Sequence, residues 1–299
     1  MQKFKAWISA ARLRTLPLSI AGILMGSSLA FEQKAFNQTI FWLAILTTLS
    51  FQILSNFAND YGDGVKGTDN DDRLGPQRAL QSGALTDKEL KHGIFINSII
   101  GLILAVALIY KAFGQDNFLA SLLFFALGIL ATIAAIKYTV GDTAYGYRGL
   151  GDVFVFVFFG LVAVLGSQYL MTNQFYEIQL LPATSIGLLS AAVLNLNNMR
   201  DENSDRNSNK LTLVVKHGKK FAKIYHVSLI CIAILCLVFY GYFRFENDQW
   251  LSLIGCIPLL IHLKKVINYT NPKDLDPELK KVALSCFAIA LVHLLTSLF

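Results

Sequence analysis

Long apolar runs alternate with short polar segments along almost the whole chain. About 20 apolar residues in a helix are enough to cross the hydrocarbon core of a bilayer. The pattern therefore predicts an all-α fold, a polytopic membrane helix bundle with nine transmembrane helices. The expected spans are 16–31, 40–59, 93–112, 118–138, 151–171, 180–199, 223–243, 249–269 and 280–299, of which the first is the shortest.

The composition agrees with this pattern. The 299 residues are 54% hydrophobic and 15% charged, whereas a soluble domain carries about 25% charged residues. No Pro/Ser-rich linker or long block of like charge divides the chain, so we expect residues 1–299 to form a single integral membrane domain. No signal-peptide cleavage site is recognisable before the first span.

The basic residues predict the orientation of the chain. With the N-terminus inside, 23 of the 26 Lys and Arg residues fall on the inner side, and only Lys34, Lys111 and Arg244 lie outside. Loops on the cytoplasmic side of a membrane carry such an excess. The net charge of +6 is thus a signal of topology. It predicts the lipid bilayer as a partner and no nucleic acid.

Two acidic clusters each follow an apolar run on this inner side. Carboxylates at such positions are costly and usually serve a function. If the helices continue, residues three or four apart share a face, so each cluster would turn its oxygen atoms toward the bundle interior. The first cluster contains Asn59, Asp60, Asp63, Asp69 and Asp72, and the second contains Asn197, Asn198, Arg200, Asp201 and Asp205.

This chemistry suits magnesium and a diphosphate. Magnesium is usually held by one or two carboxylates together with substrate phosphates. Two clusters facing each other would bind a diphosphate between them, and nearby basic side chains would contact its oxygen atoms. Because the site lies at the end of an apolar bundle, it favours a substrate with a diphosphate head and an apolar tail. The expected diphosphate-binding residues are Asn59, Arg73, Arg78, Arg200 and Lys210.

Other functions were weighed against this one. An EF-hand is excluded because Val65 occupies the third position counted from Asp63. No Gly-Lys-Ser/Thr string is present, which excludes a phosphate-binding P-loop. A cation-coupled membrane transporter also uses acidic residues within the membrane. From the residues alone, the transporter and the diphosphate enzyme remain equally compatible with the chain.

Longer strings of residues are more specific than the acidic clusters. A chain that carries them on nine spans resembles the UbiA superfamily of intramembrane prenyltransferases over nearly its whole length. The strings are Asn59-Asp60-x-x-Asp63, Asp201-x-x-x-Asp205, Arg12-x-Arg14-Thr15-Leu16-Pro17, Tyr145-Gly146-Tyr147-Arg148-Gly149-Leu150-Gly151-Asp152 and Lys210-x-Thr212-Leu213-Val214-Val215.

One departure narrows the resemblance. Many members of the superfamily have an acid where this chain has Gly67, and here the next acids are Asp69 and Asp72. This variant, followed by Arg73-x-Gly75-Pro76, resembles the branch that prenylates 1,4-dihydroxy-2-naphthoate in menaquinone biosynthesis. Of the two later acids we prefer Asp69 as the replacement.

The resemblance implies a magnesium-dependent transferase of the bacterial cytoplasmic (inner) membrane, with its active site facing the cytoplasm. An all-trans polyprenyl diphosphate would ionise, the dihydroxynaphthoate ring would attack the prenyl cation, and loss of the carboxylate would give demethylmenaquinone. An acceptor such as 4-hydroxybenzoate is the alternative within the superfamily. The implied catalytic residues are Asp60, Asp63, Asp201 and Asp205, and the implied metal ligands are these four and Asp69.

The resemblance also suggests residues for the aromatic acceptor and the cation. We expect Lys137 or Arg148, with Arg12, to hold the naphthoate carboxylate, and the ring faces of Tyr138 and Tyr147 to stabilise the prenyl cation. The alternative for each tyrosine is an anchor at the membrane interface, and for Lys137 it is a contribution to topology alone.

Overall fold

The computed structural model describes residues 2–69, 74–244 and 247–298 and confirms the all-α prediction. Within these ranges, nine helical segments are long and apolar enough to cross a membrane. They are Lys3–Glu32, Gln38–Val65, Asp87–Phe113, Phe118–Lys137, Gly151–Thr172, Glu177–Arg200, Leu213–Arg244, Trp250–Asn268 and Pro272–Thr296. Each overlaps one span expected from the sequence.

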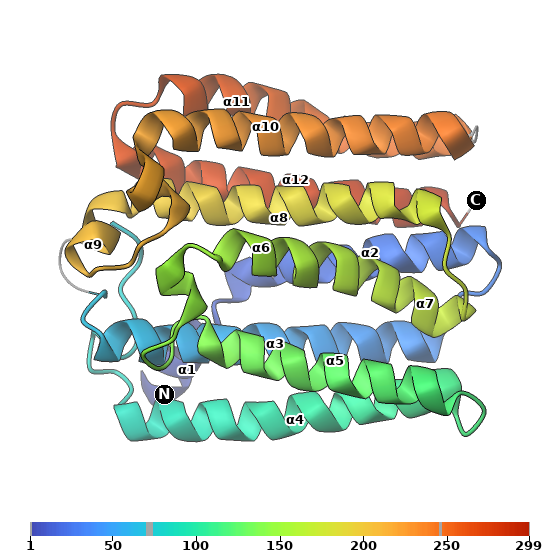
Figure 1. Cartoon of the computed structure of the whole chain (residues 1–299), viewed down its shortest axis with the longest axis horizontal. Helices are drawn as coiled ribbons and strands as arrows, with labels where there is room; N and C mark the ends of the chain where they lie inside the picture. The colour runs from blue at the N-terminus through green and yellow to red at the C-terminus, as the bar shows by residue number, and fades with distance from the viewer. Residues whose placement is uncertain (1, 70–73, 245–246, 299) are drawn as a thin grey trace.

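The spans lie side by side, with a short helix at the N-terminus and another between the sixth and seventh spans (Figure 1). The helices are α1 Gln2–Ala11, α2 Leu16–Glu32, α3 Gln38–Val65, α4 Asp87–Phe113, α5 Phe118–Lys137, α6 Gly151–Val155, α7 Gly166–Thr172, α8 Leu180–Arg200, α9 Glu202–Asn207, α10 Leu213–Arg244, α11 Ile257–Asn268 and α12 Asp276–Thr296. A π-helix, η3 (Phe156–Leu165), joins α6 to α7.

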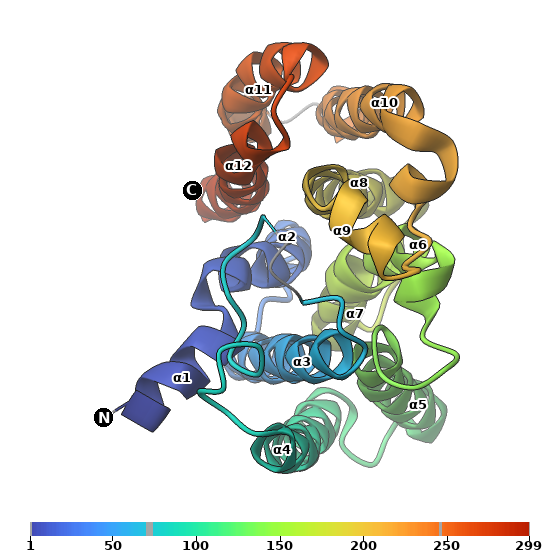
Figure 2. The same ribbon diagram turned by 90° about the vertical axis from the view of Figure 1, so that its left-hand side faces the viewer.

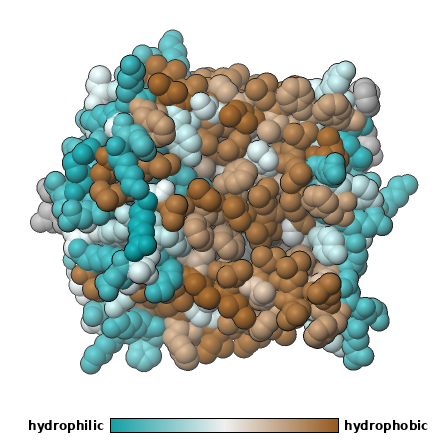
Figure 3. All heavy atoms as spheres, in the orientation of Figure 1, coloured by the Kyte–Doolittle hydropathy of each residue, from teal (hydrophilic) through white to brown (hydrophobic). Residues whose placement is uncertain are grey.

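The surface has the pattern of a protein that crosses a bilayer. A broad hydrophobic band covers the middle of the molecule, and hydrophilic residues gather at both ends (Figure 3). Large apolar side chains of the spans are exposed, among them Phe95 at 64% and Ile103 at 63% in α4. Lipid tails, which are as apolar as these side chains, would remove this surface from water.

Local sequence signals explain where several helices begin. Thr86 and Glu89 form a capping box at the start of α4, in which the Thr86 amide donates to the Glu89 carboxylate at 2.9 Å. Asn37 caps α3 by accepting hydrogen bonds from the amides of Thr39 and Ile40. Both caps lie in connections outside the apolar runs, so α3 and α4 start before the spans that hydropathy predicts.

Two helices extend further than their apolar runs. Helix α3 continues through the first acidic cluster to Val65, so that Asp60 and Asp63 lie in its last turns. The seventh span begins at Leu213, ten residues before its expected start, and is kinked at Gly218, whose φ of 79° is easy only for glycine. Hydropathy alone does not predict the polar ends of these two helices.

Glycines let the fifth span approach its neighbours closely. A Cβ atom built on Gly160 in η3 would lie 2.6 Å from the Cα of Gly187 in α8. On the other side, a Cβ on Gly26 in α2 would lie 2.2 Å from the carbonyl oxygen of Val164. Small residues at such contacts are typical of helix packing in lipid. They fix the π-helix against α2 and α8.

Buried polar groups tie the last three helices together. His226 in α10 and His262 in α11 share a hydrogen bond of 2.7 Å between their Nε2 atoms. His262 is in turn hydrogen-bonded through Nδ1 to Glu278 in α12, at 2.6 Å. The spacing of the histidines along the sequence does not predict this hydrogen-bonded network, because its three side chains come together only when the helices pack.

Candidate active site

A cavity of about 600 Å³ begins at the end of the bundle where α3 and α8 terminate. Its polar part is lined by residues of both acidic clusters, and its deeper part is lined by apolar residues of α3, α4, α5 and the fifth span. Figure 2 looks onto the polar end, where α9 and the connection from α3 to α4 lie across the helix ends. The cavity therefore has one charged end and one apolar end.

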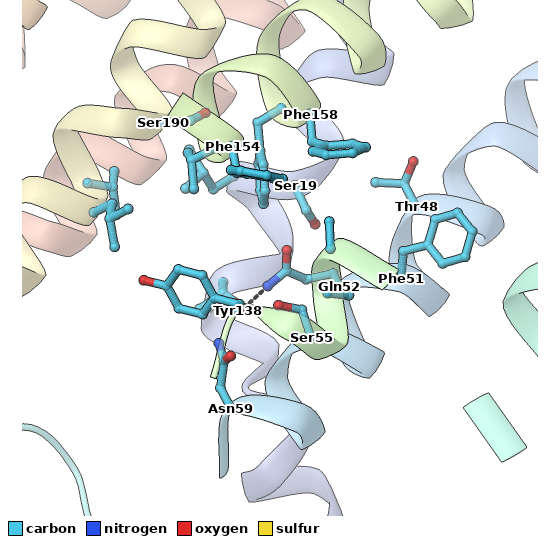
Figure 4. A pocket seen from close by; sticks show the side chains of 18 of the residues that line it. Ser19, Thr48, Phe51, Gln52, Ser55, Asn59, Tyr138, Phe154, Phe158 and Ser190 are labelled. Atoms are coloured by element: carbon cyan, nitrogen blue, oxygen red, sulfur yellow. Dashed lines mark hydrogen bonds between the residues drawn. The ribbon is translucent and has the colours of Figure 1, made fainter. Parts of the chain in front are cut away.

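Residues spaced four apart place the first cluster in this cavity. Ser55, Asn59 and Asp63 line it from one face of α3. Figure 4 shows Gln52, Ser55 and Asn59 following one another along this face, beside the ring of Tyr138. The structure thus brings Asn59 and Asp63 to the site, as expected from the sequence.

Asp60 lies on a different face of α3 and does not line the main cavity. Its side chain is buried, and its two carboxylate oxygens accept hydrogen bonds from the backbone amides of Ala79 and Leu80 at 3.1 and 3.2 Å. We expected Asp60 and Asp63 to face the site together, and this is wrong for Asp60, because only Asp63 lines the main cavity. Asp60 holds the connection between α3 and α4 and borders a smaller, neighbouring cavity.

The second cluster spans the junction of α8 and α9. Asn197, Asp201 and Asp205 all line the cavity, as their four-residue spacing predicts. The helical hydrogen bonds continue across the break, because the Asp201 amide donates to the Asn197 carbonyl and the Asp205 amide donates to the Asp201 carbonyl. The polar stripe therefore stays in register although α8 ends at Arg200.

Arg200 is engaged by protein groups in this structure. Its Nε and Nη2 atoms donate to both carboxylate oxygens of Asp201, at 2.9 and 2.7 Å. Its Nη1 atom donates to Asp276 at the start of α12, at 2.6 Å. This bidentate pairing fixes the orientation of Asp201. No sequence signal pointed to Asp276, which is 76 residues away along the chain.

Lys210 joins the two clusters. Its Nζ atom lies 3.6 Å from Oδ2 of Asp63 and 3.7 Å from Oδ1 of Asp205. Burial by itself would lower the pKa of this ammonium group, but the carboxylates of Asp63 and Asp205 raise the pKa well above its ordinary value of 10.5. Lys210 is therefore a permanent cation at the centre of the site.

The connection after α3 supplies further charged groups. Asp69 and Arg78 both line the cavity, with Arg78 Nε 3.6 Å from Asp69 Oδ1. Thr68, which the sequence did not single out, also lines it, and its carbonyl accepts a hydrogen bond from Ser204 at 3.3 Å. The other expected groups of this connection, Arg73 and Asp72, lie outside the described residues.

The two tyrosines expected at the site occupy different positions. Tyr138 lines the cavity, as Figure 4 shows. Tyr147 lies behind Asp63, to which its hydroxyl donates a hydrogen bond at 2.8 Å, and Lys66 Nζ lies 3.9 Å from the centre of its ring. Burial and the charge of Asp63 raise the pKa of Tyr147, which keeps it a neutral donor. Tyr147 does not line the cavity, so its ring is not placed to contact a cation there.

The basic residues expected to hold the acceptor are also divided. Arg12 lines the cavity, and so do Arg14, which the sequence gave only as part of a family motif, and Lys280, which the sequence did not single out. Lys137 and Arg148 are exposed and do not line it. Lys137 sits at the end of α5 and Arg148 in a short 3₁₀ turn, Tyr145–Arg148. Periodicity within a span does not reveal which way such terminal side chains point.

A row of aromatic rings in the cavity wall was also not anticipated. Tyr145 stacks on Phe154 with ring centres 3.9 Å apart, and Phe154 lies 6.3 Å from Phe158. All three rings line the cavity, and Figure 4 shows Phe154 and Phe158 above Tyr138. The four-residue spacing of Phe154 and Phe158 was a signal for a shared face, but it did not reveal what that face would contact.

The donor set fits magnesium only together with a substrate. In the described ranges, no group of three His, Cys, Asp and Glu side chains converges as a ready-made metal site. However, one ammonium group lies within 4 Å of carboxylates from both clusters. Magnesium is commonly held by a few carboxylates and completed by phosphate oxygens and water. Asp63, Asp69, Asp201 and Asp205 are the carboxylates placed to contribute.

Comparison with known proteins places this site in a family. The family model described as the UbiA prenyltransferase family matches residues 17–291. The chain belongs to the UbiA prenyltransferase family. It is 41% identical to 1,4-dihydroxy-2-naphthoate octaprenyltransferase of Escherichia coli, over 94% of this chain and 91% of that protein. It is also 41% identical to the enzyme of the same name from Haemophilus influenzae, over 95% and 92% of the two chains.

Solved structures agree on the fold. A UbiA homologue from Aeropyrum pernix superposes with a TM-score of 0.69 at 14% identity, covering 94% of this chain and 96% of that one. A homologue from Archaeoglobus fulgidus, bound to DMAPP and Mg²⁺, gives a TM-score of 0.63 at 14% identity, covering 94% and 98%. These structures share the fold of this chain, while the family model confirms the resemblance that the motifs indicated.

Proposed function

We propose that this chain transfers a polyprenyl group from an all-trans polyprenyl diphosphate to 1,4-dihydroxy-2-naphthoate, with loss of carbon dioxide. The observation that carries the proposal is the shape and charge of the cavity, in which Asp63 and Asp205 meet around Lys210 at the mouth of an apolar channel. Such a cavity suits a diphosphate head and a prenyl tail. The names of the relatives at 41% identity support the naphthoate as acceptor.

The diphosphate would bind at the charged end. Lys210 and Arg78 line this end and would contact its oxygen atoms. Asp63, Asp69, Asp201 and Asp205 would hold magnesium, which when bound neutralises the charge of the departing diphosphate. Because Arg200 is paired with Asp201 and Asp276, we assign it the positioning of Asp201 rather than direct contact with phosphate.

The acceptor would bind where the charged end meets the aromatic wall. The C–O bond of the allylic diphosphate breaks, and the ring carbon that bears the carboxylate forms a bond to the prenyl carbon. Carbon dioxide then leaves and returns its bonding electron pair to the ring, which gives the hydroquinone of demethylmenaquinone. No ring proton has to be removed, so the site needs no general base. The ring of Tyr138 faces the cavity and would stabilise positive charge on the prenyl group.

The acceptor carboxylate needs a cation that reaches the cavity. Arg12 lines the cavity, whereas Lys137 and Arg148 do not, so we assign this carboxylate to Arg12 with Arg14 beside it. Arg12 has a left-handed backbone conformation, with φ at 50°, which is uncommon outside glycine. Asn56 supports this turn, because its Nδ2 atom donates to the carbonyl of Ala11 at 2.9 Å.

We further propose that the chain acts as one catalytic domain in the cytoplasmic membrane of a bacterium, with this site facing the cytoplasm. The excess of basic residues at the same end of the bundle supports that orientation. The cation-coupled transporter is the less favoured function, because both acidic clusters lie at one end of the molecule and share a single cavity.

An activity assay tests the function. Purified protein with magnesium, dihydroxynaphthoate and octaprenyl diphosphate should release diphosphate and carbon dioxide in equal amounts and yield a product of the expected mass. Asp63→Ala and Asp201→Ala should each reduce turnover by at least 100-fold, on the order of 2.7 kcal/mol in the activation barrier.

Two results would contradict the proposal. Turnover of 4-hydroxybenzoate without turnover of the naphthoate would move the chain to another acceptor. Full activity of both aspartate variants would refute the site.

Removal of magnesium with a chelator should abolish activity, and its return should restore activity.

A further inference from the structure

The cavity runs along most of the length of the bundle. On α3 its lining extends from Asp63 to Ala44, which corresponds to about 28 Å along a helix that rises about 1.5 Å per residue. This is close to the thickness of the hydrocarbon core of a bilayer, about 30 Å. An apolar tail bound with its head at Asp63 would therefore extend toward the opposite side of the membrane.

The cavity ends at one level on three helices. Ala44 in α3 lines it but Ile40, one turn further, does not. Ile109 in α4 lines it but Phe113 does not, and on α5 the lining ends at Phe124. Ile40 and Phe113 are instead part of a buried apolar cluster, with exposed fractions of only 4% each. Packed side chains therefore close the far end along α3, α4 and α5.

Three aromatic rings make up part of this closure. Phe113 in α4 lies 5.4 Å from Phe124 in α5, measured between ring centres. Tyr169 in α7 stacks on Phe124 at 5.9 Å and lies 6.2 Å from Phe113. Of the three, Phe124 faces the cavity, while the other two stand behind it. Closely spaced rings from three helices give a rigid boundary.

We propose that this ring cluster, Phe113, Phe124 and Tyr169, is the floor of the tail channel and sets the longest prenyl chain that the enzyme uses efficiently. The inference rests on the proposed function and adds a determinant of its specificity. A tail that reaches the floor gains from burying every methylene group. A longer tail must displace packed rings or fold back on itself, and overpacking is unfavourable.

One glycine sets the width of the channel just above the floor. Gly128 lies one turn from Phe124 on α5, and both residues line the cavity. A Cβ atom on Gly128 would meet only the Cβ of Ala105, at an ordinary distance of 3.6 Å. The backbone therefore tolerates a side chain here. A large one would extend into the channel and raise its effective floor.

Opposite substitutions should move the preference in opposite directions. The experiment measures kcat/KM for a series of all-trans prenyl diphosphates of increasing length, with dihydroxynaphthoate as acceptor. Phe124→Ala should raise the ratio of kcat/KM for the longest donor to that for the shortest by at least tenfold. Gly128→Leu should lower the same ratio by at least tenfold. A tenfold change corresponds to about 1.4 kcal/mol.

Matched controls come from the other side of the same helix. Phe125 and Ala126 are both exposed on α5 and do not line the cavity. Phe125→Ala repeats the removal of a phenyl ring, and Ala126→Leu introduces the same leucine side chain in place of a small residue. Both variants should leave the preference for donor length within about twofold of the unsubstituted enzyme. A structural effect alone would reduce activity equally for all donors, whereas the inference requires a change in the ratio.

The outcomes separate this inference from the proposed function. If the unsubstituted enzyme prenylates the naphthoate but Phe124→Ala and Gly128→Leu leave the length ratio unchanged, the tail leaves the bundle sideways into the lipid and the floor proposal is wrong. If the naphthoate is not prenylated, the proposed function fails. The length ratio is then measured as binding of the donor series alone, which keeps the floor proposal testable.

Discussion

Helix geometry gives Asp60 and Asp63 different surroundings and different roles. Asp60 and Asp63 are adjacent acids of one motif, yet one accepts hydrogen bonds from the backbone of the α3–α4 connection and the other faces the cavity. Successive residues on a helix are rotated by about 100°, since a turn contains 3.6 residues. Asp63 lies one turn beyond Asn59 and on the same side of α3, whereas Asp60 follows Asn59 directly and points about 100° away from it, out of the main cavity.

Substitution of these two acids should have different effects. Asp60→Ala leaves the buried Ala79 amide and the half-buried Leu80 amide without their acceptor, and an unsatisfied buried group costs about 1–3 kcal/mol. We expect a lower midpoint of thermal unfolding in detergent. The concentration of magnesium that gives half-maximal activity should not change, because Asp60 does not line the cavity.

Asp63→Asn is the matched comparison. It should abolish activity with little change in the unfolding midpoint, since it retains the shape of the side chain. If Asp60→Ala instead shifts the magnesium requirement severalfold while stability is unchanged, Asp60 binds the metal and its assignment to the connection is wrong.

Lys210 shows how charge is balanced when the substrate is absent. Two carboxylates that face each other across a buried space repel, and an ammonium group between them removes that repulsion. Since its pKa in the folded protein is raised, this ion-pair stabilisation is fully present below the ordinary pKa of 10.5 and is lost only as pH rises through the higher folded value. Lys210 therefore introduces no titration near neutral pH.

At the scale of elements, the fifth span is the most unusual. Its middle is a π-helix of 10 residues, Phe156–Leu165, and π-helical segments are rare and occur frequently at functional sites. The π-helix is held between α2 and α8 by glycines on both sides, and its free side lines the cavity with Phe158 and Val162. Close packing against α2 and α8 thus fixes the position of the side chains with which the π-helix lines the cavity.

Gly160 should tolerate no side chain. A Cβ atom there would lie 2.6 Å from the Cα of Gly187 and 2.7 Å from the carbonyl oxygen of Ala183, and both are backbone atoms. We expect Gly160→Ala to lower stability by about 1–3 kcal/mol, the usual cost of overpacking. Unfolding by a denaturing detergent, followed by circular dichroism, measures the loss.

Gly128→Ala is the control for this substitution. It places the same methyl group in a helix where the nearest neighbour, Ala105, is 3.6 Å away. Alanine favours the helix over glycine by about 1 kcal/mol, so this variant should be at least as stable as the original. Equal destabilisation by both substitutions would show that packing against α8 is not what makes Gly160 necessary.

The whole molecule combines an apolar belt with a site at one end. Both acidic clusters lie at the end of the bundle that also carries the expected excess of basic residues, although they are separated by more than a hundred residues in the chain. An odd number of spans places the two termini at opposite ends, as Figure 1 shows. A soluble acceptor and a membrane-bound donor can thus reach one site from different phases.

Labelling of single cysteines tests the sidedness. The four native cysteines lie within spans, three of them buried and Cys231 exposed within the apolar belt, so they give little background with a membrane-impermeant maleimide. Asp116→Cys, in the α4–α5 connection, should react only from the periplasmic side. Lys273→Cys, before α12, should react only from the cytoplasmic side. The reverse pattern would place the site on the outer face.

The sequence by itself determined the spans, the two acidic clusters and the family resemblance. These depend on local properties, namely the hydropathy of each run and the order of residues within a motif. The position of Asp69 at the cavity and the meeting of the two clusters also agree with what their patterns predicted.

Only the tertiary structure decided which of these residues share the site. It moved Asp60 out of the cavity, left Lys137 and Arg148 at the surface and placed Lys210 between the clusters. The physical reason is that a side chain's surroundings depend on how helices distant in sequence are rotated and packed against each other. Hydropathy runs indicate which part of a helix crosses the membrane, but the rotation of the helix is set by contacts such as those at Gly160.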